Sequence, residues 1–219
     1  MLKNFTKIEI ATAIAVLFHT IGLVGLLYFD KTFFLTATAF NLLLSFTLLL
    51  RTQPQKNLYF FLFFAACFFI GIAVEIIGIN TAILFGDYTY GNVLGYKFKN
   101  VPILIGINWF IIIYCCGISI HTLLTKAINK LAAATRKEPS ALKALSVIVD
   151  GATMAVFFDW LMEPVAVKLG YWMWNGDGSI PMLNYICWFG VSLILLAIFH
   201  FTKFSKQNKF AVNLLLIQL

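Results

Sequence analysis

Six stretches of the chain are almost continuously apolar, and polar residues are concentrated in the segments between them. The stretches cover residues 8–28, 32–50, 58–80, 102–124, 142–163 and 182–202. Each is close to the ~20 residues that an α-helix needs to cross the hydrocarbon of a bilayer. The pattern predicts an all-α fold, a polytopic transmembrane bundle of about six spans that forms a single integral membrane domain over residues 1–219.

The two ends of the chain need separate interpretation. Residues 210–219 are apolar, but as a helix they would be only about 15 Å long, too short to cross the bilayer. We expect an interfacial tail or a helix cut short, which could belong to a seventh span. The first apolar stretch has no small-residue cleavage site and is longer than a signal-peptide core, so we interpret it as a span.

Composition and charge agree with a membrane location. The chain is 61% hydrophobic and 11% charged, far from the roughly 25% charged residues of soluble domains. Its net charge of +7 fits the positive-inside rule better than a nucleic-acid partner. With a cytoplasmic N-terminus, 12 of the 16 basic residues fall inside: Lys3, Lys7, Arg51, Lys56, Lys126, Lys130, Arg136, Lys137, Lys143, Lys203, Lys206 and Lys209. We therefore predict a multi-pass protein of the cell membrane.

Four of the nine acidic residues lie inside predicted spans: Glu75, Asp150, Asp159 and Glu163. A charged carboxylate at the bilayer centre costs roughly 2.5 to 3.5 kcal/mol on insertion scales, so such acids normally face the protein interior and mark a function. Glu75 and Asp159 precede the outer ends of their helices by about one turn. Glu163 should end its helix, because Pro164 disfavours helical geometry at the preceding residue.

Residue spacing indicates which way these acids point. Glu75 shares a helix face with Gly71 and Gly78, and Asp159 and Glu163 follow two alanines at the same spacing. We expect the three carboxyl groups to meet inside the bundle just below its outer surface. The alternative is that they are buried acids kept for packing alone. Asp150 lies half a turn round its helix, where a structural polar contact is the simpler interpretation.

Aromatic side chains gather at the outer ends of the last four spans. They are Tyr88, Tyr90, Tyr96, Trp109, Tyr171, Trp172, Trp174, Tyr185 and Trp188. An interfacial aromatic belt would explain some of them. The functional interpretation is a lining whose π-faces stabilise a carbocation.

Motifs for metals and nucleotides are not recognisable in the sequence. His19, His121 and His200 share no ligand spacing, and there is no C-x-x-C, P-loop or G-x-G-x-x-G pattern. We therefore predict no metal site and no cofactor, which leaves acid chemistry carried out by side chains.

Two segments carry a family resemblance. They are EIIGINTAILFGDYTYGNVLGYKFKNVPILIGINW (75–109) and DWLMEPVAVKLGYWMWNGDGSIPMLNYICWF (159–189), within a core of about residues 70–190. They resemble the carotenoid biosynthesis membrane proteins that include carotenoid 1′,2′-hydratases and bisanhydrobacterioruberin hydratase. Glu163 stands where that family is expected to have an aspartate before proline.

The resemblance implies a hydratase that adds water to the C1′,2′ double bond of an acyclic carotenoid lying in the bilayer. A carboxylic acid would protonate C2′, and water would capture the tertiary cation at C1′. Other carotenoid enzymes would be candidate partners. Asp159 is then expected to be the proton donor or its immediate partner, Glu75 the second member, and Glu163 a modulator or water-orienting base. The end-group pocket is expected to include Asp87, Tyr88, Tyr90, Trp109, Trp172, Trp174 and Asn184.

Three other functions fit part of the pattern. A lycopene-cyclase-type carotenoid cyclase needs the same protonation but lets a neighbouring alkene trap the cation. A small proton-coupled transporter also carries intramembrane acids. A structural membrane partner without activity is the third alternative.

Overall fold

The computed structural model describes residues 5–135 and 140–219, which form seven helices and four short strands. The helices are α1 (Lys7–Tyr28), α2 (Lys31–Thr52), α3 (Leu58–Thr81), α4 (Leu104–Thr135), α5 (Ser140–Leu169), α6 (Met182–Phe201) and α7 (Lys209–Gln218). The strands are β1 (Tyr88–Tyr90), β2 (Lys97–Phe98), β3 (Val101–Pro102) and β4 (Trp172–Trp174). Helices α1 to α6 are long and apolar enough to cross a membrane, which confirms the predicted all-α bundle of six spans.

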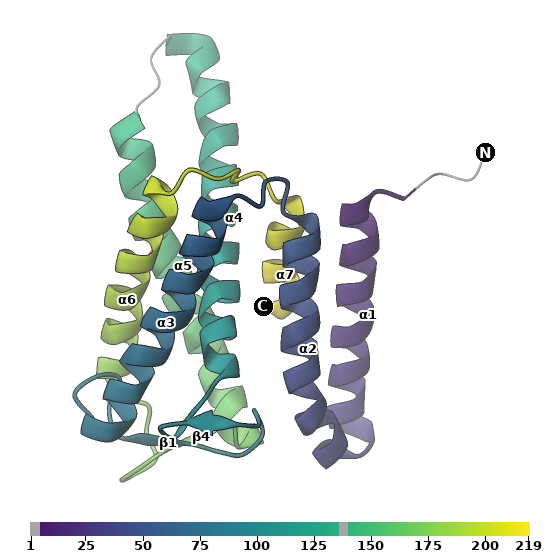
Figure 1. Cartoon of the computed structure of the whole chain (residues 1–219), viewed down its shortest axis with the longest axis vertical. Helices are drawn as coiled ribbons and strands as arrows, with labels where there is room; N and C mark the ends of the chain where they lie inside the picture. The colour runs from purple at the N-terminus through teal and green to yellow at the C-terminus, as the bar shows by residue number, and fades with distance from the viewer. Residues whose placement is uncertain (1–4, 136–139) are drawn as a thin grey trace.

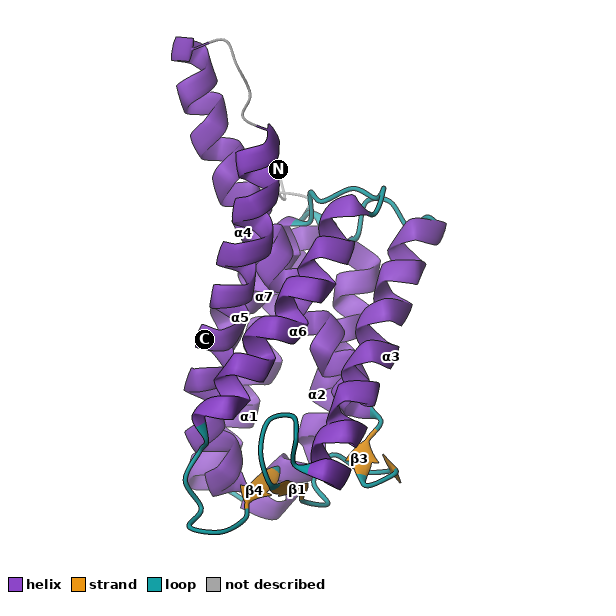
Figure 2. Ribbon diagram, turned by 90° about the vertical axis from the view of Figure 1, so that its left-hand side faces the viewer, coloured by secondary structure: helices purple, strands orange, loops and turns teal. Residues whose placement is uncertain are grey.

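Helix α4 forms the centre of the bundle. It packs against α3, α5 and α6 on one side and against α2 and α7 on the other (Figure 1). Every residue from Trp109 to Ile120 is buried, whereas α1 and α2 expose most of their surface. Strands β1 and β4 lie across one end of the bundle, below α3 to α6 (Figure 2). This is the end that holds the pocket described below.

The basic segments lie at the opposite end. The start of α1 and the α2–α3 and α6–α7 connections are all found there, away from the strands (Figure 1). Of the residues used to predict topology, Lys3, Arg136 and Lys137 lie outside the described residues. That this end faces the cytoplasm stays a prediction from the positive-inside rule.

Helix α5 continues through Pro164 to Leu169 instead of ending at Glu163. Proline removes one backbone hydrogen bond, a loss that transmembrane helices tolerate. The helix ends at Gly170, which has φ +76°, and the Tyr171 N–H donates to the Ala166 carbonyl at 3.0 Å. This is a glycine-terminated C-cap. The six extra residues add about 9 Å of helix beyond Glu163, so the α5 acids lie deeper than the sequence predicts.

Helix α7 is a half-length helix inside the bundle. Its buried residues Phe210, Ala211, Leu214 and Leu215 belong to a helix that packs against α1, α2 and α4. Of the two expectations for residues 210–219, the short helix is confirmed and the interfacial tail is wrong. The helix is short enough to insert beside α4 without reaching the far end of the bundle (Figure 1).

A buried polar junction centred on Asn208 holds α7 in place. The Asn208 amide donates to Thr52 Oγ1 at 3.2 Å and to the Tyr114 hydroxyl at 3.1 Å, and its Oδ1 caps α7 by accepting from Phe210 N–H at 3.1 Å. Tyr114 in turn donates to Gln53 Oε1. Helices α2, α4 and α7 are thus joined by hydrogen bonds that water does not reach.

Close packing of α3 on α4 depends on Gly71. A Cβ atom added there would lie 2.6 Å from the Trp109 ring. Because glycine has no side chain, Trp109 can lie against α3 and stack on Trp188 of α6, with ring centroids 4.1 Å apart and planes 19° apart. This agrees with the predicted small-residue face around Glu75.

Substituting Asn208 tests the polar junction. Asn208→Ala removes the α7 cap and leaves buried partners unsatisfied, so it should lower the free energy of unfolding by about 1 to 3 kcal/mol. Thermal unfolding in detergent measures the effect. Asn80→Ala is the control, because the exposed Asn80 amide bonds only to the Ile76 carbonyl of its own helix. Equal melting temperatures for the two variants would contradict the assigned role.

Substituting Gly71 tests the close packing of α3 on α4. Gly71→Ala should push Trp109 out of place, which lowers the melting temperature and weakens the near-UV circular dichroism of the Trp109–Trp188 stack. Gly22→Ala is the control, because no atom lies within 4 Å of an added Cβ there, and alanine favours a helix over glycine by roughly 0.5 to 1 kcal/mol. If both variants keep the wild-type spectrum, the close approach at Gly71 has no structural role.

Candidate functional site

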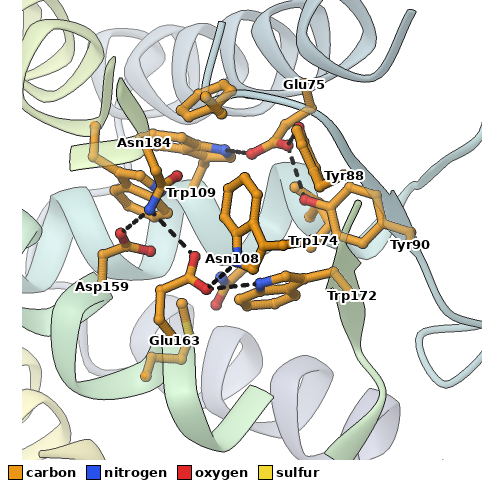
Figure 3. Close-up of a pocket in the computed structure, with 14 residues that line it drawn as sticks. Glu75, Tyr88, Tyr90, Asn108, Trp109, Asp159, Glu163, Trp172, Trp174 and Asn184 are labelled. Carbon is orange, nitrogen blue, oxygen red and sulfur yellow. Dashed lines mark hydrogen bonds between the residues drawn. The ribbon is translucent and has the colours of Figure 1, made fainter. Parts of the chain in front are cut away.

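A pocket at the strand end of the bundle brings together nine of the ten predicted site residues. They come from α3 to α6 and from strands β1 and β4 (Figure 3). The nine are Glu75, Tyr88, Tyr90, Trp109, Asp159, Glu163, Trp172, Trp174 and Asn184. The three acids are buried, as the residue spacing predicts.

Strand pairing places four aromatic residues over the acids. Strands β1 and β4 are antiparallel, with Tyr88 opposite Trp174 and Tyr90 opposite Trp172. Alternate residues of a strand point to opposite faces, so all four rings face the pocket. The middle residues, Thr89 and Met173, are exposed on the outer face. The YTY and WMW sequences are therefore a period-2 signal, which sequence reasoning missed because each strand has only three residues.

Glu75 accepts three hydrogen bonds from aromatic side chains. Its Oε2 accepts from the hydroxyls of Tyr88 at 2.5 Å and Tyr90 at 2.8 Å, and its Oε1 accepts from Trp109 Nε1 at 3.0 Å. Burial raises the pKa of Tyr88 and Tyr90 well above the ordinary tyrosine value, and the nearby charge of Glu75 raises the pKa of both further. Both hydroxyls therefore stay protonated and act as donors at neutral pH.

Glu163 also accepts three hydrogen bonds. Its Oε2 accepts from the indole N–H groups of Trp172 and Trp174, both at 3.0 Å, and its Oε1 accepts from Asn184 Nδ2 at 3.2 Å. Charge on a buried carboxylate is costly unless donors surround it. The donors around Glu75 and Glu163 are thus arranged to compensate a negative charge on each.

Asp159 differs from the other two acids. It is fully buried, and Asn184 Nδ2 donates to its Oδ2 at 2.8 Å. Its Oδ1 has no hydrogen-bond partner among residues 5–135 and 140–219. Asn184 bridges Asp159 and Glu163 (Figure 3). Asp159 is therefore the acid with an uncommitted oxygen inside the pocket.

The pocket is small, and aromatic side chains make up half of its lining residues. The space that the centres of water molecules can occupy is about 30 Å³, and one water needs about 10 to 15 Å³. The pocket therefore has room for about two waters. A branched terpenoid end group is larger, so binding one requires movement of side chains at the half-buried edge, which includes Tyr90, Met162 and Trp172.

Two acids lie away from the pocket. Asp87, predicted as a pocket residue, is exposed and accepts from Asn175 Nδ2 at 2.7 Å. This bond ties the residue before β1 to the residue after β4. Asp150 is exposed and bonded to Ser146 on its own helix, as expected of a structural polar contact.

Other lining residues were assigned no site role from the sequence. Trp188 belongs to the predicted aromatic cluster, and its stack on Trp109 places it in the wall. Asn108 also lines the pocket. Its only sequence signal is an amide next to Trp109 in an otherwise apolar helix. No group of three His, Cys, Asp or Glu side chains in the described part of the chain is arranged to hold a metal ion.

Comparisons with known proteins place the chain in a family. The sequence profile of the family described as "Carotenoid biosynthesis protein" matches residues 31–218, and this range includes every residue of the pocket. Searches of curated proteins and of solved structures find no match. The matched range covers most of the chain, from α2 to α7. The chain therefore belongs to the carotenoid biosynthesis protein family.

Proposed function

We propose that the protein is a cofactor-independent hydratase that adds water to the C1′,2′ double bond of an acyclic carotenoid end group. The main support is the buried Asp159, whose Oδ1 has no hydrogen-bond partner among the described residues. The two neighbouring acids each accept hydrogen bonds from three donors. The family supplies the substrate class, an apolar polyene that dissolves in the membrane around the bundle.

The first step is proton transfer from Asp159 to C2′. The π-electron pair of the alkene forms the new C2′–H bond, and the positive charge remains on C1′, a tertiary carbon. General acid catalysis by a positioned carboxyl group supports this step. Aromatic side chains of the lining, such as Tyr88, Trp172 and Trp174, stabilise the cation through their quadrupoles.

The second step is capture of the cation by water. The water oxygen forms a bond to C1′, and one water proton passes to the carboxylate of Glu163. Proton return from Glu163 to Asp159 restores the starting state, so the net reaction is alkene plus water to tertiary alcohol. Glu75 does not exchange a proton in this scheme. Its charge, fixed by three donors, stabilises the cation electrostatically.

A carotenoid cyclase remains the alternative enzyme. It would use the same protonation by Asp159, and a neighbouring alkene would then trap the cation. Polar side chains in the lining, which include Asn108, Asn184 and the three acids, can bind water and so favour hydration. A transporter is less well supported, since the three buried acids line a single pocket and do not form a chain through the bundle.

The test is expression in cells that accumulate an acyclic carotenoid, followed by mass spectrometry of the pigment. Hydration adds the mass of one water per end group, whereas cyclisation adds none. Asp159→Asn should lower hydrated pigment at least about 100-fold, the scale of lost general acid catalysis.

Asp150→Asn is the matched control, because Asp150 lies on the same helix but is exposed and outside the pocket. It should stay within about twofold of wild type. Hydrated pigment at the wild-type level from a stably expressed Asp159→Asn protein would refute the role of Asp159.

A further inference from the structure

Asn108 is a pocket residue whose amide is not committed to the protein. It lies in the first turns of α4, is half-buried and lines the cavity beside the three acids. No hydrogen bond joins its side chain to another pocket residue in Figure 3, nor to any other residue in the described ranges. An asparagine amide offers two N–H donors and a carbonyl acceptor, so this group can bind something in the cavity.

The other hydrogen-bond donors that line the cavity beside Asn108 already donate to carboxylates. Tyr88, Tyr90 and Trp109 donate to Glu75, and Trp172 and Trp174 donate to Glu163. These five groups hold carboxylates and are poorly placed to orient a nucleophile. The Asn184 amide N–H groups also donate to carboxylates, so Asn108 is the amide of the pocket lining whose N–H groups are not used in this way among the described residues.

Position and volume both favour water as its ligand. The Asn108 amide and the Glu163 carboxyl belong to side chains that line the same cavity. A buried water needs two to four polar partners. The amide of Asn108 and the carboxylate of Glu163 together meet that requirement, within a cavity that has about 30 Å³ for water centres.

We infer that Asn108 is a positioning residue that holds the water for attack on C1′ and so directs the reaction to the alcohol. The inference rests on the proposed function. Asn108 accepts one hydrogen bond from the water while Glu163 accepts the proton that the water loses. Without this water, the cation would lose a proton from C2′ or an adjacent methyl group to Glu163 and return an alkene.

The test separates protonation from water capture. Membranes that contain the protein and an acyclic carotenoid are incubated in D2O, and mass spectrometry measures alcohol and deuterated alkene. In Asn108→Leu the alcohol should fall at least tenfold, while deuterated alkene stays equal to wild type or rises. Asn108→Ser, which keeps a hydroxyl donor and acceptor, should recover at least a third of the alcohol. Asn80→Leu, an exposed asparagine on α3, should match wild type.

Two results would overturn the inference. One is alcohol formation by Asn108→Leu within twofold of wild type. The other is an equal fall of alcohol and deuterated alkene with no recovery in Asn108→Ser, which would show a purely structural role. Failure of the hydratase proposal itself looks different, because the wild-type protein would then form no alcohol at all.

Discussion

Burial of three carboxyl groups in an apolar bundle is the constraint on which the rest of the structure depends. Each group needs compensation, since an uncompensated buried charge costs several kcal/mol. Among the described residues of the bundle helices, the donors to these acids are Trp109 and Asn184. The remaining donors come from strands β1 and β4, which carry two tyrosines and two tryptophans over the acids. The connections between spans are therefore part of the site, and their pairing is required for the acids to remain buried.

The three acids differ in how many hydrogen-bond donors surround them. Glu75 and Glu163 have donors on both oxygens, and these donors are aromatic side chains except for the Asn184 amide. Such fixed dipoles favour negative charge without reorganising during a reaction. Asp159 shares a single amide with Glu163 and leaves one oxygen uncommitted. In the proposed mechanism, Asp159 is the neutral acid that gives its proton to the alkene, and the carboxylates of Glu75 and Glu163 stabilise the cation that results.

The sequence predicts the spans and the meeting of the acids, because both follow from local rules of hydrophobicity and helical spacing. It does not predict the contacts that depend on distant segments. The β1–β4 pairing joins residues more than eighty positions apart, and the Asn208 junction joins α2, α4 and α7. Pro164 indicates a helix end, yet α5 continues because Gly170 supplies a better one. Asp87 has the right residue type near the pocket, but its bond to Asn175 holds it outside.

The location of the pocket at the end of the bundle suits the opposite demands of the two proposed steps. Proton transfer to an alkene is favoured in a dry, apolar setting, where the acid has no competing water to protonate. Capture requires a water molecule, which the hydrocarbon interior does not supply. Asp159 is fully buried, whereas the edge around Tyr90, Asn108 and Trp172 is half-buried. Asp159 thus lies on the more buried side of the pocket, and Asn108 lies on the more exposed side. In the proposed mechanism, the fate of the carbocation therefore depends on whether its C1′ faces the buried acid or the half-buried edge.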